Sequence, residues 1–329
     1  MTVEDIPKIV LHLHLDGSID INDAFKWALE DGINYTKKDL LKELQVDENV
    51  KSLNDYLEKF NLSCKLLQTC RRLEQTSYHL FKKLAKLNVI YAEVRFAPNK
   101  HLDNNLNLDD VVISVINGFN KANLEMGIMG GIILCMMRGD TKEDNLNIIN
   151  IAKKYLGKGV VGIDLAGAEA IYPTRDYASL FKYAKSEGIP YTIHAGEAAS
   201  VDSINAALDV GTKRIGHGIR CIDDNATEKR IIDEEILLEV CVTSNYQTEA
   251  ISGKHPIEKL YKDGVKINIS TDNDTVSNID INKEYEKILN ETNLDINDLL
   301  ECNIGSIPYI FANNEVKERL QRIYKEIRK

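Results

Sequence analysis

The sequence contains no Cys-x-x-Cys pair, although six cysteines are spread over its 329 residues. The spacing therefore offers neither the usual paired-cysteine zinc motif nor a redox-active dithiol. Most of the cysteines lie within apolar runs, as reduced cysteines in a protein core do. We expect all six to be free thiols.

Basic charge and long apolar runs are also scarce. Lys and Arg number 41 against 51 Asp and Glu, which gives a net charge of −10. Nucleic-acid binding needs a basic surface, so this balance argues against a nucleic-acid partner. No apolar run approaches the roughly 20 residues that span a membrane. The opening residues, Met1-Thr-Val-Glu-Asp5, are acidic where a signal peptide is basic. We therefore expect a cytoplasmic protein, and the sequence leaves its oligomeric state open.

Short runs rich in Val and Ile alternate with amphipathic segments along most of the chain. After a first strand that starts at residue 8, we predict strands at residues 89–96, 130–137, 160–166, 190–194, 214–217, 237–243 and 265–270. Strands that alternate with helices indicate a parallel sheet. Eight of them favour an α/β fold of the (β/α)8 TIM-barrel type, which typically needs about 250 residues. The alternative is a doubly wound open sheet, but no Gly-x-Gly-x-x-Gly follows the first strand.

Two further helical regions are predicted outside the eight strand–helix units of the barrel. Residues 35 to about 87 have helical spacing throughout, so we predict a helical lid inserted after the first strand. Extra helices are predicted near the C-terminus, at residues 282–289, from 295 onward and at 314–327. No internal repeat, low-complexity tract or Pro/Gly linker divides the chain. We predict a single domain over residues 1–329.

The stretch Lys8-Ile-Val-Leu-His-Leu-His-Leu-Asp-Gly-Ser18 places polar side chains on one face of the first strand. Residues two apart in a strand point the same way, so His12, His14 and Asp16 lie opposite the leucines. Two imidazoles and a carboxylate are unfavourable to bury unless something binds them. A divalent metal is the natural occupant, because neutral imidazole is its commonest protein ligand. A strand with two hydrogen-bonded histidines is the alternative for this stretch alone.

Other polar residues fall at the ends of later strands. His194 and Glu197 come at the fifth strand, His217 ends the sixth, and Asp272 follows the eighth. Strand ends converge on one mouth of a barrel, where active sites form. Zinc takes nitrogen and carboxylate ligands and lowers the pKa of bound water, so His217 is a candidate base for that water. Glu197 is a candidate proton donor to a substrate.

Six motifs resemble the adenosine deaminase family, in the family's order and over nearly the whole chain. They are His12-Leu-His-Leu-Asp-Gly-Ser18, Arg95-Phe-Ala-Pro98, Gly162-Ile-Asp-Leu-Ala-Gly-Ala-Glu169, His194-Ala-Gly-Glu197, Arg214-Ile-Gly-His-Gly218 and Ser270-Thr-Asp272. Members of this family, within the amidohydrolase superfamily, are zinc-dependent (β/α)8 barrels that convert adenosine to inosine and ammonia. The resemblance implies one Zn²⁺ per chain, adenosine or 2′-deoxyadenosine as the small-molecule substrate, and a place in purine salvage.

The resemblance also implies roles for individual residues. The implied zinc ligands are His12, His14, His194 and Asp272. His217 is implied to deprotonate or orient the hydroxide that attacks C6 of the purine, which Asp272 also helps orient, while Glu197 protonates N1. For substrate binding, the backbone N–H of Gly167 is implied to contact N3, and Asp16 to accept a hydrogen bond from the ribose 5′-hydroxyl beside His14.

Two further features of the family match this chain less closely. Leu53, Tyr56 and Phe60 match positions that form an apolar gate over the purine, with plain core packing as the alternative for the two aromatic residues. The family often has two aspartates after the eighth strand, whereas this sequence reads Asp272-Asn273-Asp274. Asn273 falls where the second aspartate binds N7, and its amide can donate the same hydrogen bond. We therefore expect activity to survive.

Other functions were weighed against this one. A second possibility is a related enzyme that acts on adenine, on a modified adenine nucleotide or on another aminopurine conjugate. A nucleotide substrate is disfavoured, because Asp16 would repel a 5′-phosphate. A metal-free barrel used for binding is disfavoured because every proposed ligand is present. A two-metal hydrolase is disfavoured because the fourth strand offers Asp164 but no bridging lysine. The His-x-Glu and Pro-Cys-x-x-Cys signature of nucleic-acid base deaminases is absent. His79, His101 and His255 receive no site role.

Overall fold

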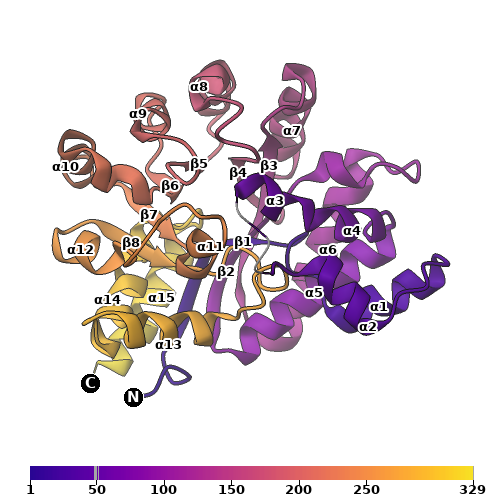
Figure 1. The fold of residues 1–329 in the computed structure, drawn as a ribbon, viewed down its shortest axis with the longest axis horizontal. Helices are drawn as coiled ribbons and strands as arrows, with labels where there is room; N and C mark the ends of the chain where they lie inside the picture. The colour runs from indigo at the N-terminus through magenta and orange to yellow at the C-terminus, as the bar shows by residue number, and fades with distance from the viewer. Residues whose placement is uncertain (48–49, 51, 329) are drawn as a thin grey trace.

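Eight parallel strands form the centre of the molecule, and helices surround them (Figure 1). The computed structural model describes residues 1–47, 50 and 52–328. The strands are β1 (Lys8–His14), β2 (Val89–Phe96), β3 (Met129–Met137), β4 (Val160–Ala166), β5 (Ile193–Ala195), β6 (Arg214–His217), β7 (Leu237–Val240) and β8 (Lys266–Ile269). The strands from β1 to β4 read as near-continuous apolar runs, as expected for a sheet that is covered on both faces.

The strands close into a barrel. Each strand from β1 to β4, and from β5 to β8, pairs in parallel with its neighbour in the chain. A parallel bridge between Ile163 and Tyr191 joins β4 to the chain before β5, and one between Leu13 and Asp272 joins β1 to the chain after β8. The predicted (β/α)8 barrel is therefore confirmed, and the open doubly wound sheet is not formed.

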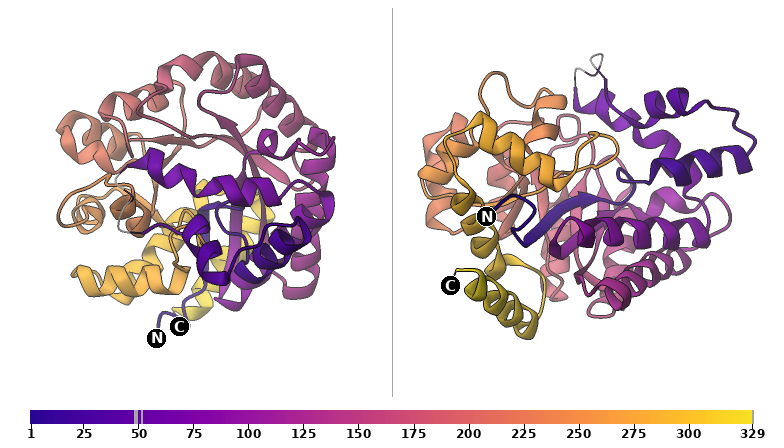
Figure 2. Two further views of the ribbon diagram at one scale, coloured as in Figure 1. Left: turned by 45° about the vertical axis from the view of Figure 1, so that its right-hand side comes forward. Right: turned by 90° about the horizontal axis from the view of Figure 1, so that it is seen from below.

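Five helices lie between β1 and β2. They are α1 (Ile21–Glu30), α2 (Lys37–Leu44), α3 (Leu53–Glu58), α4 (Phe60–Leu66) and α5 (Cys70–Lys86). The helical spacing over residues 35–87 is divided among α2, α3, α4 and α5, and the side chains of Thr36, Ser52 and Thr69 accept backbone N–H groups as the N-caps of α2, α3 and α5. Residues 48, 49 and 51 of that range lie outside the described residues. Helix α5 packs against β2 and α6, as a barrel helix does, while α1–α4 lie to one side of the barrel (Figure 2).

The remaining helices follow the later strands. They are α6 (Leu108–Met126), α7 (Lys142–Tyr155), α8 (Ala178–Ser186), α9 (Val201–Asp209), α10 (Asn225–Asp233), α11 (Val242–Gln247), α12 (Ile257–Lys262), α13 (Ile281–Glu291), α14 (Ile296–Ser306) and α15 (Asn314–Ile327). Four short 3-10 helices are η1 (Pro98–His101), η2 (Thr174–Tyr177), η3 (Ile219–Asp223) and η4 (Ile307–Tyr309). Helix α14 packs against β8 and β1. In α15, the Tyr324 hydroxyl donates to the Pro7 carbonyl at 2.7 Å and so holds the end of the chain beside its start (Figure 1).

Two strand boundaries differ from the prediction by three residues. The seventh strand was expected to reach residue 243, but β7 ends at Val240 and α11 follows. The backbone N–H of Thr243 donates to Glu284 of α13 at 2.9 Å, which draws this segment away from the sheet. The fifth strand was expected over residues 190–194, but β5 begins at Ile193. Pro190 has no N–H to donate, and Tyr191 makes only an isolated bridge.

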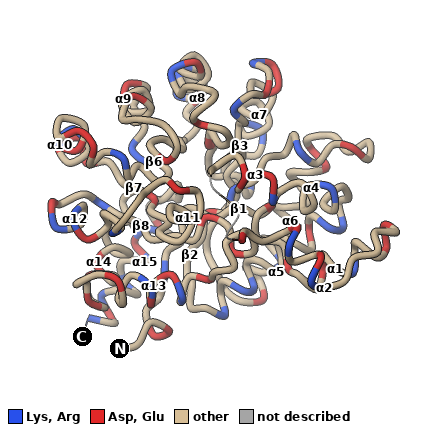
Figure 3. The backbone as a smooth tube through the Cα atoms, viewed as in Figure 1, with Lys and Arg blue, Asp and Glu red and all other residues tan. Residues whose placement is uncertain are grey.

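Apolar side chains fill the space between strands and helices, whereas charged residues lie mostly along the outer helices. A single large cluster of buried apolar residues runs from Val3 to Tyr324. Basic and acidic residues are interspersed on the outer helices (Figure 3). None of the helices within the described residues is both long and apolar enough to cross a membrane.

Candidate active site

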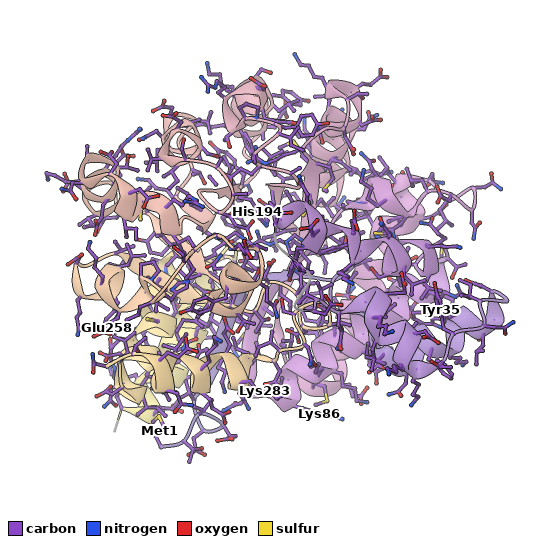
Figure 4. All side chains as sticks on the ribbon, viewed as in Figure 1. Met1, Tyr35, Lys86, His194, Glu258 and Lys283 are labelled. Carbon is purple, nitrogen blue, oxygen red and sulfur yellow. The ribbon has the colours of Figure 1, made fainter. Side chains whose placement is uncertain are left out.

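The C-terminal ends of the strands surround a cavity of about 540 Å³. Every predicted site residue except His12 is among those that line it. His194, labelled in Figure 4, lies near the middle of the molecule, inside the ring of helices. His12 lies just beneath, with its ring centroid 4.5 Å from that of His194. The volume falls in the range of ordinary small-molecule sites.

The four predicted metal ligands point toward one location. Nε2 of His14 lies 3.2 Å from Nε2 of His194, and Oδ1 of Asp272 lies 3.3 Å from Nε2 of His12 and 3.5 Å from Nε2 of His14. Ligands bound at about 2.0–2.2 Å around a tetrahedral zinc ion lie about 3.3–3.6 Å apart. The buried Nε2 of His12 has no hydrogen-bond partner. These residues therefore fit a divalent metal ion.

Two buried carboxylates hold the outer ring nitrogens of these histidines. Glu239 Oε2 lies 2.9 Å from Nδ1 of His12, and Asp164 Oδ2 lies 2.8 Å from Nδ1 of His194. Each ring therefore turns its Nε2 to the common point, which is how proteins usually orient metal-binding histidines. Arg95 donates to both carboxylates, at 2.7 Å to Glu239 and 2.8 Å to Asp164.

Asp272 and His217 occupy strained backbone positions. Their φ angles are +64° and +60°, a region that non-glycine residues seldom adopt. Such strain persists where the surrounding structure enforces it, often at functional sites. The Ser244 hydroxyl donates to Oδ2 of Asp272 at 2.6 Å and leaves Oδ1 toward the histidines. Burial tends to raise the pKa of Asp272, but the His12 imidazole 3.3 Å away and the other nearby imidazoles hold it well below its usual range.

Glu197 lies at a turn that another carboxylate shapes. Glu169 accepts backbone N–H groups from Gly196, Glu197, Ala198 and Ala199 at 2.6–3.1 Å. This turn places the Glu197 carboxyl, which is nearly fully buried, 3.5 Å from Nε2 of His217. Burial, with the charges of Asp272 and Glu169, raises the pKa of Glu197 well above its usual value. The raised pKa favours the protonated carboxyl, which can donate a proton.

The predicted substrate-binding residues line the same cavity. Asp16 is buried and its Oδ1 has no partner, while burial raises its pKa to about 6. Gly167 follows β4 with a φ of +103°, which a residue with a side chain would rarely adopt. Asn273 is buried against Gly17, where an added Cβ would lie 1.8 Å from its Oδ1. Gly17 therefore makes room for the Asn273 side chain.

The three predicted gate residues lie on α3 and at the start of α4. Leu53, Tyr56 and Phe60 all line the cavity. The Tyr56 hydroxyl lies 2.7 Å from the Ser277 hydroxyl, so Tyr56 is tied to the loop after β8. The Phe60 ring meets the His14 ring edge to face, with centroids 6.3 Å apart. Whether these residues move as a gate stays a prediction.

Some residues that shape the site were not identified from the sequence. Glu169, Glu239 and Asn245 each contact a predicted site residue or its backbone. Glu239 carried a signal, since it is a lone charge within the apolar run of β7. His255 was given no site role, yet it is buried and contacts Asn245, which in turn contacts His217.

The fold is shared with solved deaminases. An N6-methyl-AMP deaminase from Arabidopsis thaliana superposes with a TM-score of 0.87 and 26% sequence identity, over 98% of this chain and 97% of that chain. Fold and site together place the protein among the (β/α)8-barrel deaminases of the amidohydrolase type.

Sequence relatives narrow this class. The adenosine deaminase family profile matches residues 7–326. An adenosine deaminase of Clostridium perfringens is 37% identical over 327 residues, which is 98% of each chain. One from Haemophilus ducreyi is 37% identical over 95% of this chain and 94% of its own. The chain belongs to the adenosine deaminase family, and it is an enzyme of that deaminase class.

Proposed function

We propose that this enzyme hydrolyses adenosine or 2′-deoxyadenosine to the corresponding inosine nucleoside and ammonia, with one bound Zn²⁺, as a cytoplasmic step of purine salvage. The observation that carries the proposal is that His12, His14, His194 and Asp272 converge beside Glu197, a buried carboxyl whose pKa is raised. A hydrolytic deaminase needs these two elements together, a source of nucleophilic water and an acid for the ring.

The donor set supports zinc in this position. Three imidazole nitrogens and one carboxylate oxygen are typical zinc ligands, and His12, His194 and Asp272 are each oriented by a neighbouring carboxylate or hydroxyl group. A bound zinc ion lowers the pKa of water toward neutrality and so provides the nucleophile at physiological pH. Other divalent ions accept the same ligands, so the metal is decided by analysis of the purified protein.

Two side chains are proposed to act on the reacting atoms. Glu197, whose raised pKa favours its protonated form, delivers a proton to N1 of the purine, so that the ring accepts electrons as C6 becomes tetrahedral. His217 lies 3.5 Å from the Glu197 carboxyl and lines the same cavity, where it deprotonates or orients the attacking oxygen. Asp272 helps to orient that oxygen. The ammonia that leaves takes up the remaining proton.

The rest of the cavity is proposed to bind the nucleoside. Gly167 offers its backbone N–H to N3, and the Asn273 amide donates to N7. The unpartnered Oδ1 of Asp16 accepts the ribose 5′-hydroxyl proton. Leu53, Tyr56 and Phe60 cover the base from above, as part of a lid that belongs to the same single catalytic domain.

A nucleotide substrate is the second candidate, because the Arabidopsis relative is described as acting on N6-methyl-AMP. Asp16 argues against it, since a buried carboxylate would lie beside the 5′-phosphate. Lys100, also in the cavity lining, has its ammonium group 2.8 Å from the Asp140 carboxylate, which already neutralises it. These contacts favour the nucleoside.

The direct test is to incubate the purified protein with adenosine and follow the ultraviolet change as the 6-amino group is lost. We expect rapid loss that stops when zinc is removed and returns when zinc is restored. AMP and N6-methyl-AMP serve as matched substrates. If the protein binds zinc but leaves adenosine unchanged, the proposal is contradicted. If only the nucleotides are turned over, the substrate is a nucleotide, as in the second candidate function.

A further inference from the structure

A chain of three hydrogen bonds leads from a backbone amide to the imidazole of His217. The Ile257 N–H, at the start of α12, donates to Nδ1 of His255 at 3.1 Å. Nε2 of His255 lies 3.1 Å from Oδ1 of Asn245, and Nδ2 of Asn245 lies 2.9 Å from Nδ1 of His217. All three side chains are buried, so water does not compete for these contacts.

The Ile257 N–H fixes the donor and the acceptor in each of these three hydrogen bonds. A backbone N–H is always a donor, so Nδ1 of His255 is an acceptor and the ring proton of His255 lies on Nε2. Nε2 then donates to Asn245, whose carbonyl oxygen must face it. The amide N–H₂ of Asn245 consequently faces His217 and donates to its Nδ1.

The opposite orientation of the Asn245 amide is excluded by the same logic. With the amide reversed, its N–H₂ would face Nε2 of His255 while the Ile257 N–H faced Nδ1. Both ring nitrogens would then have to accept, which a neutral imidazole with one N–H cannot do. Any such arrangement leaves a buried donor without a partner, at a cost of about 1–3 kcal/mol.

We propose that His255 and Asn245 lock His217 in the neutral tautomer that carries its proton on Nε2, so that His217 donates a hydrogen bond to the attacking oxygen instead of removing its proton. Nε2 of His217 is buried without a hydrogen-bond partner, and His217 borders the cavity beside Glu197. A protonated Nε2 also cannot bind a metal, which separates His217 from the proposed ligands, although one of its ring nitrogens lies within 4.8 Å of ligand atoms of His12, His194 and Asp272.

This inference rests on the proposed function for the role of His217, but the tautomer itself does not. Neither His255 nor Asn245 is among the residues that line the cavity, so they are positioning residues that act through His217. The inference also decides between the two roles that the proposed mechanism leaves open for His217.

The test reads the tautomer directly in the zinc-loaded enzyme labelled with ¹⁵N-histidine. Long-range proton–nitrogen correlation spectra separate a protonated from an unprotonated ring nitrogen. We expect His217 to show a protonated Nε2 and a bare Nδ1, and His255 the same. A predominant Nδ1–H form of His217 overturns the proposal.

A matched pair of variants tests the relay. His255→Gln keeps one acceptor for Ile257 and one donor for Asn245, whereas His255→Phe keeps neither. In His255→Phe the Asn245 amide is free to turn, and we expect both tautomers of His217 to appear. With equal populations, kcat falls about twofold or more while KM stays unchanged, and His255→Gln restores both readouts.

The outcomes distinguish this inference from the proposed function. A pure Nε2–H signal in His255→Phe contradicts the role of His255. If the wild-type spectrum shows the expected tautomer but adenosine is not deaminated, the relay stands and the proposed function fails. If His255→Phe does not fold, the wild-type spectrum and His255→Gln still decide the tautomer.

Discussion

Arg95 connects the supports of two proposed metal ligands. It is fully buried and bonds both Asp164 and Glu239, which lie against Nδ1 of His194 and His12. Replacing Arg95 by Met removes the cation and leaves the shape roughly filled. Asp164 then keeps its negative charge without a cationic guanidinium beside it, and its remaining partners are the His194 imidazole, the Leu165 N–H and the Cys135 thiol. We expect losses of both folded stability and metal affinity.

The two losses differ in size. Removing one partner of a buried ion pair costs about 3–5 kcal/mol, because the other charge stays buried without compensation. Loss of the groups that orient metal ligands weakens metal binding about 10- to 100-fold. Each factor of ten corresponds to about 1.4 kcal/mol, so the affinity loss is about 1.4–2.7 kcal/mol.

The assay measures both quantities on the same preparations. Zinc dissociation constants come from competition with a chromophoric chelator, and free energies of unfolding come from urea titration of the metal-free protein. Arg214→Met is the matched control. Arg214 is as buried as Arg95 and bonds Glu239 at 2.7 Å, but within the described residues no hydrogen bond or ion pair joins it to Asp164.

We expect Arg214→Met to lose comparable stability but less zinc affinity than Arg95→Met. Equal weakening of zinc binding in both variants would refute the reasoning, because the contact with Asp164 would then contribute nothing. A folded Arg95→Met protein with the wild-type zinc dissociation constant would refute it as well.

Three further variants test other parts of the site. His217→Ala should lower turnover by about 10²–10⁴-fold while zinc content, measured by atomic absorption, stays at one per chain; loss of zinc would instead make His217 a ligand. Glu197→Gln should keep zinc and bind purine inhibitors yet lose rate, and a near-normal rate would remove Glu197 as the acid. Burial raises the pKa of Glu284 to about 7, so the folded protein holds this proton more tightly than the unfolded chain. The resulting stability is present below about pH 4.5 and is lost as the pH rises through 7. Relative to Glu284→Gln, wild-type unfolding free energy should therefore fall by about 3 kcal/mol across that range in urea titrations, and a constant difference would contradict this.

The barrel and the positions of its polar residues could be predicted because both depend on local sequence. Alternating apolar strands and amphipathic helices identify the fold, and a parallel barrel brings all strand ends to one mouth. That rule alone predicts that His194, His217 and Asp272 lie close together. Strand boundaries were less predictable where a distant side chain decides them, as Glu284 does when it binds Thr243 and ends β7.

The groups that orient the site residues could not be predicted in the same way. Asn245 reaches His217 across 28 residues of sequence, and Glu239 reaches His12 across 227. Such contacts depend on the packing of separate elements, which leaves no periodic pattern in the sequence. His255 shows the limit most clearly, because a histidine beside a proline at a helix start has no local sign of its connection to His217.

Closure of the barrel and assembly of the metal site occur at the same seam. The His14 N–H donates to the Asp272 carbonyl at 2.8 Å, and the Asp272 N–H donates to the His12 carbonyl at 3.0 Å. These backbone bonds join the first strand to the chain after the last one, between residues whose side chains are three of the four proposed ligands. A metal ion bound there would therefore stabilise the junction between the two ends of the sheet, since a ligand that binds only the folded state shifts the folding equilibrium toward it. The positive φ of Asp272 is consistent with this arrangement, because the chain must turn out of β8 at the point where it both pairs with β1 and directs a carboxylate at the histidines.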